Sequence, residues 1–206
     1  EKDFEPVTNL FFQVSGIAAA ASLGVNSFAD LRRVLGAKQR PLNFATLGPG
    51  TSMDLLRQWM ASNWKADFVG VPYKGMNLIL NALTAGESNL TMTSLGSSGP
   101  YLQSGKVKLL AVNSAKRLTR MPDVPTYDEV GLKEFNELMG ATWWGLVVPA
   151  GVSDTIVRRL NNEFARAFKQ PKIVTLLDRQ FLQPAIDTPE NFAAFLKVDR
   201  QRAERA

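Results

Sequence analysis

Short apolar runs alternate with amphipathic segments along most of the chain. Each run is rich in β-branched or aromatic residues and is followed by a turn and then by apolar residues at helical spacing. This alternation is typical of an α/β domain in which a mainly parallel sheet is flanked by helices. The expected strands are residues 42–46, 68–72, 89–93 and 107–113, and the expected helices are 51–63, 76–85 and 100–103.

Three expected helices begin with residues that commonly cap a helix. Ser27 with Asp30, and Thr51 with Asp54, have the spacing of a capping box, in which the first side chain accepts a hydrogen bond from the third helical amide. Thr188 precedes a proline and an acid, which is another frequent helix start. We therefore expect helices to begin at these three places.

From residue 151 the pattern changes to an α-rich tail. Apolar residues recur at helical spacing over 153–169, 171–180 and 190–204, with one short apolar stretch at 182–186. The tail is therefore expected to consist of three helices and at most one strand.

The residue types that are absent exclude several kinds of chemistry. The chain has 206 residues, is 45% hydrophobic and contains neither His nor Cys. Ser-His-Asp and Cys-His catalysis, zinc sites with His or Cys ligands, iron–sulfur clusters and disulfides are therefore excluded. No run resembles the acidic loop of an EF-hand, so we assign neither a metal nor a cofactor.

The net charge of +5 is spread along the chain. Lys and Arg number 24 against 19 Asp and Glu, without a block of like charges or a basic stripe interleaved with aromatics. This distribution is typical of solvated helix faces, so no nucleic-acid partner is expected. No stretch reaches the roughly 18 apolar residues of a membrane span, and no signal-peptide pattern opens the sequence.

The first candidate binding feature is the turn between residues 42–46 and the helix after it. Thr46, Gly48, Gly50, Thr51 and Ser52 combine a strand end, a glycine-rich loop and a helix start. Ligands of open α/β sheets bind at such places, because glycines let the backbone approach the ligand and unpaired helix amides favour an anion. The alternative is that these residues only make a tight turn and a cap.

Two further strand ends carry polar residues. Tyr73, Lys74 and Gly75 offer a phenol, a cation and a flexible backbone point, whereas Thr93 and Ser94 open a turn rich in hydroxyls and glycines. The carboxyl ends of parallel strands meet at one edge, so the three turns would line one cleft. This grouping favours a small anionic ligand over plain solvated connections.

Motifs for catalysis are weak. Ser62 and Lys65 match the Ser-x-x-Lys pattern of some acyl-enzymes, but no companion motif accompanies them, and chance is the better explanation. The pair Trp143 and Trp144 is more often core than ligand platform, although strand alternation allows one ring to face a cleft. We therefore assign no catalytic residue.

Several motifs occur in the order and at the spacing found in a known receptor family. They are residues 2–8 (KDFEPVT), 43–46 (NFAT), 50–52 (GTS), 71–75 (VPYKG), 111–117 (AVNSAKR), 122–126 (PDVPT), 129–131 (EVG) and 141–150 (ATWWGLVVPA). Over essentially its whole length the chain resembles the Bug receptors, the TctC-like extracytoplasmic solute-binding proteins of tripartite tricarboxylate transporters.

The resemblance implies a fold like that of type II periplasmic binding proteins, in which two lobes close over a carboxylate. It implies that residues 16–142 form the complete second lobe, and that 1–15 and 143–206 are crossing strands and C-terminal helices of the first lobe. Family members carry a signal peptide and most of the first lobe ahead of the KDFEPVT stretch. The chain is therefore expected to be a fragment whose C-terminal helices self-associate or detach.

The chain departs from the family pattern at three places. A His usually follows the GTS motif, where this chain has Met53 and Asp54, and two acids of the third turn are replaced by the neutral stretch 89–94, which includes Asn89. Residues 17–21 are mostly alanine, which favours a helix, while their place between turn residues allows a strand. The family pattern assigns this segment to a strand.

Residues and resemblance together favour a receptor without catalytic activity. It would capture a small organic carboxylate in the periplasm and deliver it to membrane transporter subunits. A sensor or interaction domain of the same fold is one alternative, and an enzyme acting on carboxylates is another. Because the family's acids are missing at the third turn, carboxylates without an amine are the expected ligands.

Overall fold

The computed structural model describes residues 3–37 and 40–204 and divides into two compact units. One unit is Ser15–Glu137, and the other joins the residues up to Val14 with those from Leu138 onward. Residues 1, 2, 38, 39, 205 and 206 lie outside the described part, and Lys2 of the KDFEPVT motif is among them.

The unit Ser15–Glu137 is built on a mixed sheet. Its described strands, in the order β4-β3-β5-β2-β6, are β4 (Phe68–Pro72), β3 (Leu42–Thr46), β5 (Leu90–Ser94), β2 (Ser15–Ala20) and β6 (Val107–Val112). Strand β3 pairs in parallel with β4 and β5, whereas β2 is antiparallel to both β5 and β6. All the strands of this sheet except β2 therefore point the same way, and the expected α/β architecture is confirmed.

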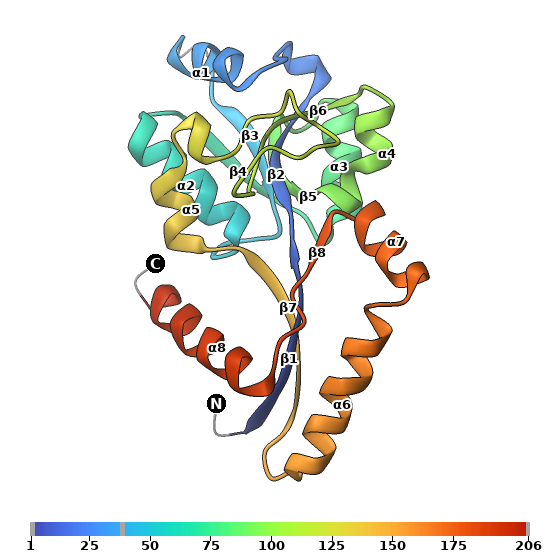
Figure 1. Cartoon of the computed structure of the whole chain (residues 1–206). Coiled ribbons are helices and arrows are strands. Elements are labelled where there is room, and N and C mark those ends of the chain that lie inside the picture. The colour runs from blue at the N-terminus through green and yellow to red at the C-terminus, as the bar shows by residue number, and fades with distance from the viewer. Residues whose placement is uncertain (1–2, 38–39, 205–206) are drawn as a thin grey trace. The chain divides into compact units, whose positions relative to one another are not determined.

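Helices flank this sheet on both sides (Figure 1). Helices α2 and α5 lie on one side, α3 and α4 lie on the other, and α1 lies near one end of the sheet. Their bounds are α1 (Phe28–Gly36), α2 (Ser52–Trp64), α3 (Met76–Ala85), α4 (Leu95–Gln103) and α5 (Lys133–Met139), and two 3-10 turns are η1 (Ala21–Leu23) and η2 (Asp128–Val130).

The helix starts follow the expected capping chemistry in two cases out of three. Ser27 Oγ accepts from the Asp30 amide at 3.1 Å and the Asp30 carboxylate accepts from the Ser27 amide at 3.1 Å, which confirms the capping box. Thr188 Oγ1 accepts from the Asn191 amide at 3.2 Å. The capping box at Thr51 is wrong, because that side chain makes no cap bond to helix α2.

Strand β2 is the most deeply buried strand of the sheet. All six of its residues are buried, and Ile17, Ala18, Ala19 and Ala20 are fully so. A strand that is covered on both faces needs no polar alternation. Burial on both faces explains why the alanine-rich segment, which local propensity leaves open, is a strand.

Gly16 of β2 has no room for a side chain. A Cβ atom there would lie 2.5 Å from the Ala111 carbonyl oxygen of β6, which is backbone and moves only with the strand. We expect Gly16→Val to lower the free energy of unfolding by about 1–3 kcal/mol, as overpacked core substitutions do. The control is Gly36→Ala at the end of α1, where nothing lies within 4 Å. Urea titration that found both variants equally stable would contradict this reading.

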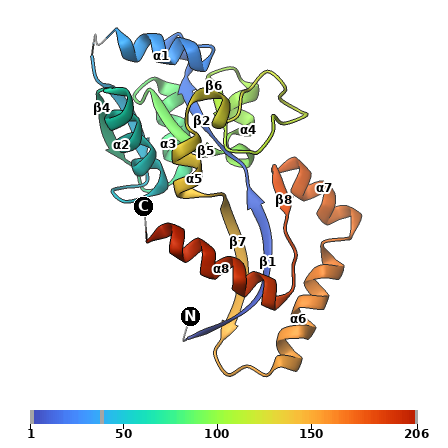
Figure 2. The same cartoon turned by 60° about the vertical axis from the view of Figure 1, so that its left-hand side comes forward.

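The second unit contains an antiparallel sheet with helices around it. Its described strands, in the order β7-β1-β8, are β7 (Thr142–Pro149), β1 (Phe4–Gln13) and β8 (Leu182–Pro184). Its helices are α6 (Asp154–Ala167), α7 (Pro171–Arg179) and α8 (Pro189–Ala203). Helices α6 and α8 lie on opposite sides of the long β1-β7 ribbon (Figure 2). The three expected tail helices and the short strand are thus present.

Aromatic rings join α8 to this ribbon. Trp143 of β7 meets Phe192 and Phe195 of α8 edge-on, with ring centroids 5.7 and 5.6 Å apart, and its Nε1 donates to Asp199 at 2.8 Å. Phe192 is 1% exposed. Trp144, on the opposite face by strand alternation, is 54% exposed. Trp143 therefore packs against α8 and is partly buried, whereas Trp144 is exposed.

Candidate functional site

The three candidate turns follow the carboxyl ends of β3, β4 and β5, which run in parallel. Thr46 at the end of β3 is in register with Pro72 at the end of β4, and the Tyr73 amide donates to the Thr46 carbonyl at 2.8 Å. Ser94 ends β5, the other parallel neighbour of β3. The topology therefore brings the expected residues to one edge of the sheet.

The β3–α2 turn, residues 47–51, is held by its own hydrogen bonds. Thr46 is 2% exposed and its Oγ1 accepts from the Gly48 amide at 3.1 Å. Thr51 Oγ1 donates back to the Gly48 carbonyl at 2.7 Å. The backbone of Gly48 and Gly50 has φ of +121° and +76°, a region that favours glycine. The two glycines are therefore required by the shape of the turn.

The first amides of α2 lie directly after this turn. The first hydrogen bond of the helix runs from the Leu55 amide to the Thr51 carbonyl at 2.9 Å. The amides of Ser52, Met53 and Asp54 precede that bond and have no partner within the helix, which is the usual state of a helix start. These groups and the helix dipole favour an anion.

A carboxylate of the chain itself lies at this helix start. Asp54 is 6% exposed, and its Oδ2 accepts from the Gly50 amide at 3.2 Å and from Gln58 Nε2 at 2.7 Å. Its Oδ1 accepts from Arg57 Nε at 2.9 Å and from the terminal nitrogen of the same guanidinium at 2.7 Å. The Gly50 amide, expected to meet a ligand, is therefore occupied by Asp54 in this structure.

The ionisation of Asp54 follows from these contacts. Burial raises the pKa of the carboxyl, but hydrogen bonds from Arg57, Gln58 and the Gly50 amide outweigh burial and leave the pKa below its ordinary value. Arg57 is itself closely packed, since a Cβ on Gly70 of β4 would lie 2.9 Å from its Nε. Asp54 is therefore a charged group whose charge is balanced in place.

At the second turn the polar groups are partly engaged. The Tyr73 hydroxyl lies 3.1 Å from Ser88 Oγ, so the phenol expected to face a ligand is bonded within the protein. Lys74 is exposed. Gly75 precedes α3 with φ of 178°, which any residue adopts, and nothing lies within 4 Å of a Cβ there. Lys74 is thus the exposed polar side chain of this turn that could contact a ligand.

The third turn is a capped helix start. Ser94 Oγ accepts from the Ser97 amide at 3.3 Å and donates to Ser97 Oγ at 2.8 Å, and Thr93 Oγ1 donates to the Ser94 carbonyl at 3.2 Å. Asn89 lies at the other end of β5, where its Oδ1 accepts from the Asn43 amide at 2.9 Å. Asn89 therefore does not share the edge of the sheet with Ser94.

One polar residue at this edge was not expected from the sequence. Ser15 begins β2, pairs in register with Ser94, and accepts at its carbonyl from the Asn113 amide at 2.7 Å. Ser15 is 6% exposed and its hydroxyl has no hydrogen-bond partner among the described residues. The sequence indicates this residue only as a single serine in an apolar run. The pairing of β2 with β5 places it beside Ser94.

Residues 113–126 form a closed loop after β6, and hydrogen bonds that involve the AKR and PDVPT motifs connect its two ends. The Val112 amide donates to the Pro125 carbonyl at 2.9 Å, and the Arg117 guanidinium reaches the Pro122 carbonyl at 3.0 Å. Arg117 Nε also lies 3.0 Å from both carboxylate oxygens of Glu129. Because β6 points in the same direction as β5, this loop starts at the same edge of the sheet as the three candidate turns.

The pairing with Arg117 makes the closed loop sensitive to acid. Hydrogen bonds from Arg117 and from the Thr126 amide lower the pKa of Glu129 from 4.5 to about 2. A carboxyl with a lowered pKa stabilises the fold above its unfolded pKa, and this stabilisation is lost as the pH falls toward 2. We expect Glu129→Gln to remove this part of the pH dependence of unfolding. Glu134→Gln on exposed α5 is the control; parallel stability curves for the wild type and Glu129→Gln between pH 5 and 2 would contradict the assignment.

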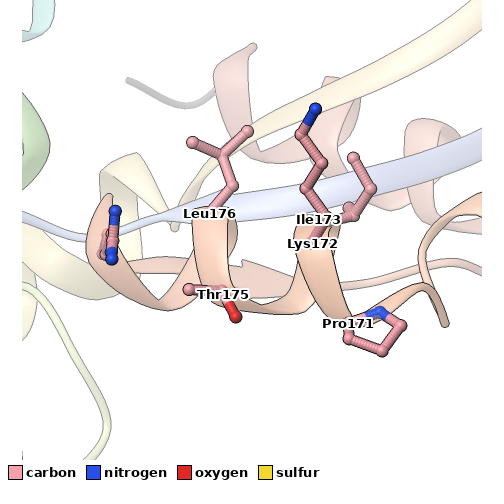
Figure 3. A pocket seen from close by; sticks show the side chains of 6 residues that line it. Pro171, Lys172, Ile173, Thr175 and Leu176 are labelled. Carbon is pink, nitrogen blue, oxygen red and sulfur yellow. The ribbon is translucent and has the colours of Figure 1, made fainter.

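A hollow of about 410 Å³ lies on the surface of α7. Figure 3 shows Lys172 and Leu176 rising from one side of the helix while Thr175 points away from them. Its lining comes from that helix alone, namely Pro171, Lys172, Ile173, Thr175, Leu176 and Arg179. A single helix cannot enclose a ligand, and the hollow contains none of the expected ligand-binding residues.

Comparison with known proteins defines the class. The model of the tripartite tricarboxylate transporter family receptors, TctC, matches residues 1–205, so the chain belongs to this family. A UPF0065 protein in the tcbD-tcbE intergenic region of Pseudomonas sp. (strain P51) is 30% identical over 209 residues, covering 100% of this chain and 60% of that protein. The resemblance to Bug and TctC-like receptors is confirmed.

Two solved structures share the fold. R. palustris Rpa4515 with adipate is 27% identical with a TM-score of 0.86, covering 99% of this chain and 67% of that one. The periplasmic binding protein BugD is 25% identical with a TM-score of 0.84, covering 98% of this chain and 67% of that one. The chain thus spans about two-thirds or less of the length of these proteins. The family and its structural neighbours are solute-binding proteins rather than enzymes.

Proposed function

We propose that the chain is the ligand-binding part of a periplasmic receptor that captures a small organic carboxylate and delivers it to a membrane transporter. It acts by binding and carries out no catalysis. In the part of the chain that the structure describes, no helix is long and apolar enough to cross a membrane. The transporter is the partner to which the family points.

The observation that carries this proposal is the meeting of three strand ends at one edge of the sheet. The amides of Ser52 and Met53 and the exposed Lys74 lie on turns at that edge, and both kinds of group suit a carboxylate. A structural neighbour that shares this fold holds adipate, a dicarboxylate. Thr46, Gly48, Gly50 and Thr51 shape the loop, while Tyr73, Gly75, Thr93 and Ser94 complete the edge.

The hydrogen bonds available at this edge are strong enough, in sum, for micromolar binding of a carboxylate. A hydrogen bond to a charged group contributes about 1.5–3 kcal/mol when water is excluded. Three such bonds approach the roughly 8 kcal/mol of a micromolar complex. Exclusion of water requires a second lobe over the carboxylate, so ligand affinity is measured on the two-lobed receptor.

The first test of the site replaces the hydroxyl of Thr51. In Thr51→Val the bond to the Gly48 carbonyl is lost and the β3–α2 turn is no longer held, so we expect weaker binding of adipate, by up to roughly tenfold, since one neutral hydrogen bond contributes about 0.5–1.5 kcal/mol. Thr155→Val, a matched exposed threonine in the first turn of α6, should leave affinity unchanged. Titration calorimetry on folded variants decides; equal affinity of Thr51→Val and the wild type would remove this turn from the site.

The second test concerns ligand class. An ammonium group buried without an acidic partner is costly. The acid nearest the first turn, Asp54, is already engaged by Arg57, Gln58 and Gly50, and Thr93 and Ser94 are neutral. We expect succinate and glutarate to raise the melting temperature more than aspartate and glutamate do. The reverse order would show that an acid in the cleft has been overlooked.

The two units also belong to this proposal. Residues 16–142 are the second lobe of the receptor, and 1–15 with 143–206 belong to the first lobe, of which these residues form the C-terminal part. The support is that the chain spans only about two-thirds of its structural neighbours, and that the second unit leaves large apolar side chains uncovered. Ile156, Val174 and Leu176 are 52%, 49% and 52% exposed.

The uncovered side chains lead to a prediction for the 206-residue chain studied alone. Phe192 and Phe195 already pack on Trp143. The apolar side chains that remain available for contact with another molecule therefore lie on the exposed faces of α6 and α7. Burying such side chains stabilises by about 1.5–3 kcal/mol each. We expect concentration-dependent self-association in sedimentation, weakened by Leu176→Lys and unaffected by Leu78→Lys on α3, which is equally exposed at 52%. A monomer at all concentrations would exclude this surface.

A further inference from the structure

The β3–α2 turn, which the proposed function assigns to the carboxylate ligand, already holds an acidic side chain. Asp54 lies one helical turn from Gly50, is 6% exposed, and accepts from the Gly50 amide at 3.2 Å. A second anion at the same helix start would be repelled by this charge unless the charge is balanced.

We infer that Asp54 and Arg57 form a positioning pair for this site: Asp54 fixes the β3–α2 turn, and Arg57 cancels the charge that would otherwise repel the ligand. This inference rests on the proposed function and adds to it two residues that do not touch the ligand.

The positioning role follows from the number of contacts on one carboxylate. Its two oxygens accept from the Gly50 backbone amide, the Gln58 side-chain amide and two nitrogens of Arg57, at 2.7 to 3.2 Å. Gly50 lies in the turn, whereas Gln58 and Arg57 lie on α2. The carboxylate therefore ties the glycine backbone of the turn to the helix.

The screening role follows from burial and charge. The Asp54 and Arg57 side chains are 9% and 20% exposed, so solvent screens the carboxylate weakly and the guanidinium must do so. Arg57 is the charged side chain bonded to Asp54 among the described residues. Lys74, on the neighbouring turn, is exposed. Neither β4, which contacts Arg57 at Gly70, nor Gln58 supplies a further charge.

The chain offers a matched comparison. Arg33 and Asp30 on α1 are also an Asp–Arg pair three residues apart at a helix start, at 2.9 Å, but Arg33 is 78% exposed and remote in sequence from the three turns. Arg33→Gln removes an arginine from the same kind of pair in solvent. It therefore controls for the general effect of losing such a pair.

The experiment measures adipate affinity of the two-lobed receptor by calorimetry between pH 6 and 8.5. In Arg57→Gln, burial of Asp54 remains while its main balancing group is gone, so the carboxylate opposes the ligand without compensation and the pKa of Asp54 rises from its lowered position. We expect Arg57→Gln to bind adipate roughly five- to tenfold more weakly than the wild type wherever Asp54 is ionised. The double variant Asp54→Asn/Arg57→Gln, Arg57→Lys and Arg33→Gln should show no such loss of affinity.

A second readout does not require ligand. The amide resonance of Gly50 should titrate at a higher pH in Arg57→Gln than in the wild type, because loss of the guanidinium raises the pKa of Asp54. Asp54→Asn, which keeps an oxygen for the Gly50 amide, should bind adipate at least as tightly as the wild type, whereas Asp54→Ala should bind it more weakly.

The outcomes separate the two proposals. Equal affinity of Arg57→Gln and the double variant Asp54→Asn/Arg57→Gln, or a Gly50 amide that titrates at the same pH in Arg57→Gln and the wild type, would overturn the positioning pair. Absence of adipate and other dicarboxylate binding by the wild-type receptor, with a Gly50 amide that titrates at higher pH in Arg57→Gln, would instead overturn the proposed function and leave the Asp54–Arg57 coupling established.

Discussion

The parallel pairing of β3 with β4 and β5 is the constraint on which the candidate site depends. Backbone hydrogen bonds hold Thr46 in register with Pro72, and the Tyr73 amide extends this ladder by one more bond to the Thr46 carbonyl. Because parallel strands need crossover helices, each strand end is followed by a turn and the start of a helix. The ladder therefore aligns the helix starts of α2, α3 and α4 at one edge.

Hydroxyl groups at this edge serve the structure before they serve a ligand. Thr51 closes its turn, Ser94 caps α4, and the Tyr73 phenol meets Ser88. Among the described residues, the free donors at this edge are the backbone amides at the start of α2, Lys74 and the Ser15 hydroxyl. A site of this kind depends on loop shape more than on particular side chains, since backbone amides are present whatever the residue. That property suits a receptor family in which relatives of about 25–30% identity keep one fold.

The negative charge of Asp54 at the candidate site is balanced by another side chain of the same helix. Asp54 lies in the first turn of α2 and by itself would oppose an anionic ligand. Arg57 and Gln58, one helical turn further along α2, donate hydrogen bonds to this carboxylate and give it a structural role. The same principle operates at lower burial in the closed loop after β6, where Arg117 holds Glu129 and the Pro122 carbonyl together.

Hydrophobic periodicity and turn residues alone determined many of the elements of this protein. The strands 42–46 and 68–72 and the helix 76–85 were predicted to the residue, whereas helix α4 begins at Leu95 and not at residue 100 as expected. The caps at Ser27 and Thr188 were predicted, the first with its partner Asp30. These features depend on neighbours within a few positions, which a sequence displays directly. Only the tertiary structure decided that β2 runs antiparallel within the sheet, that Trp143 packs on α8 while Trp144 is exposed, and that Thr51 bonds Gly48 instead of capping α2. It also decided that Asp54 occupies the Gly50 amide and that Ser15 lies beside Ser94. The reason is that a polar side chain has several partners of similar strength within reach, and packing of segments distant in sequence selects among them.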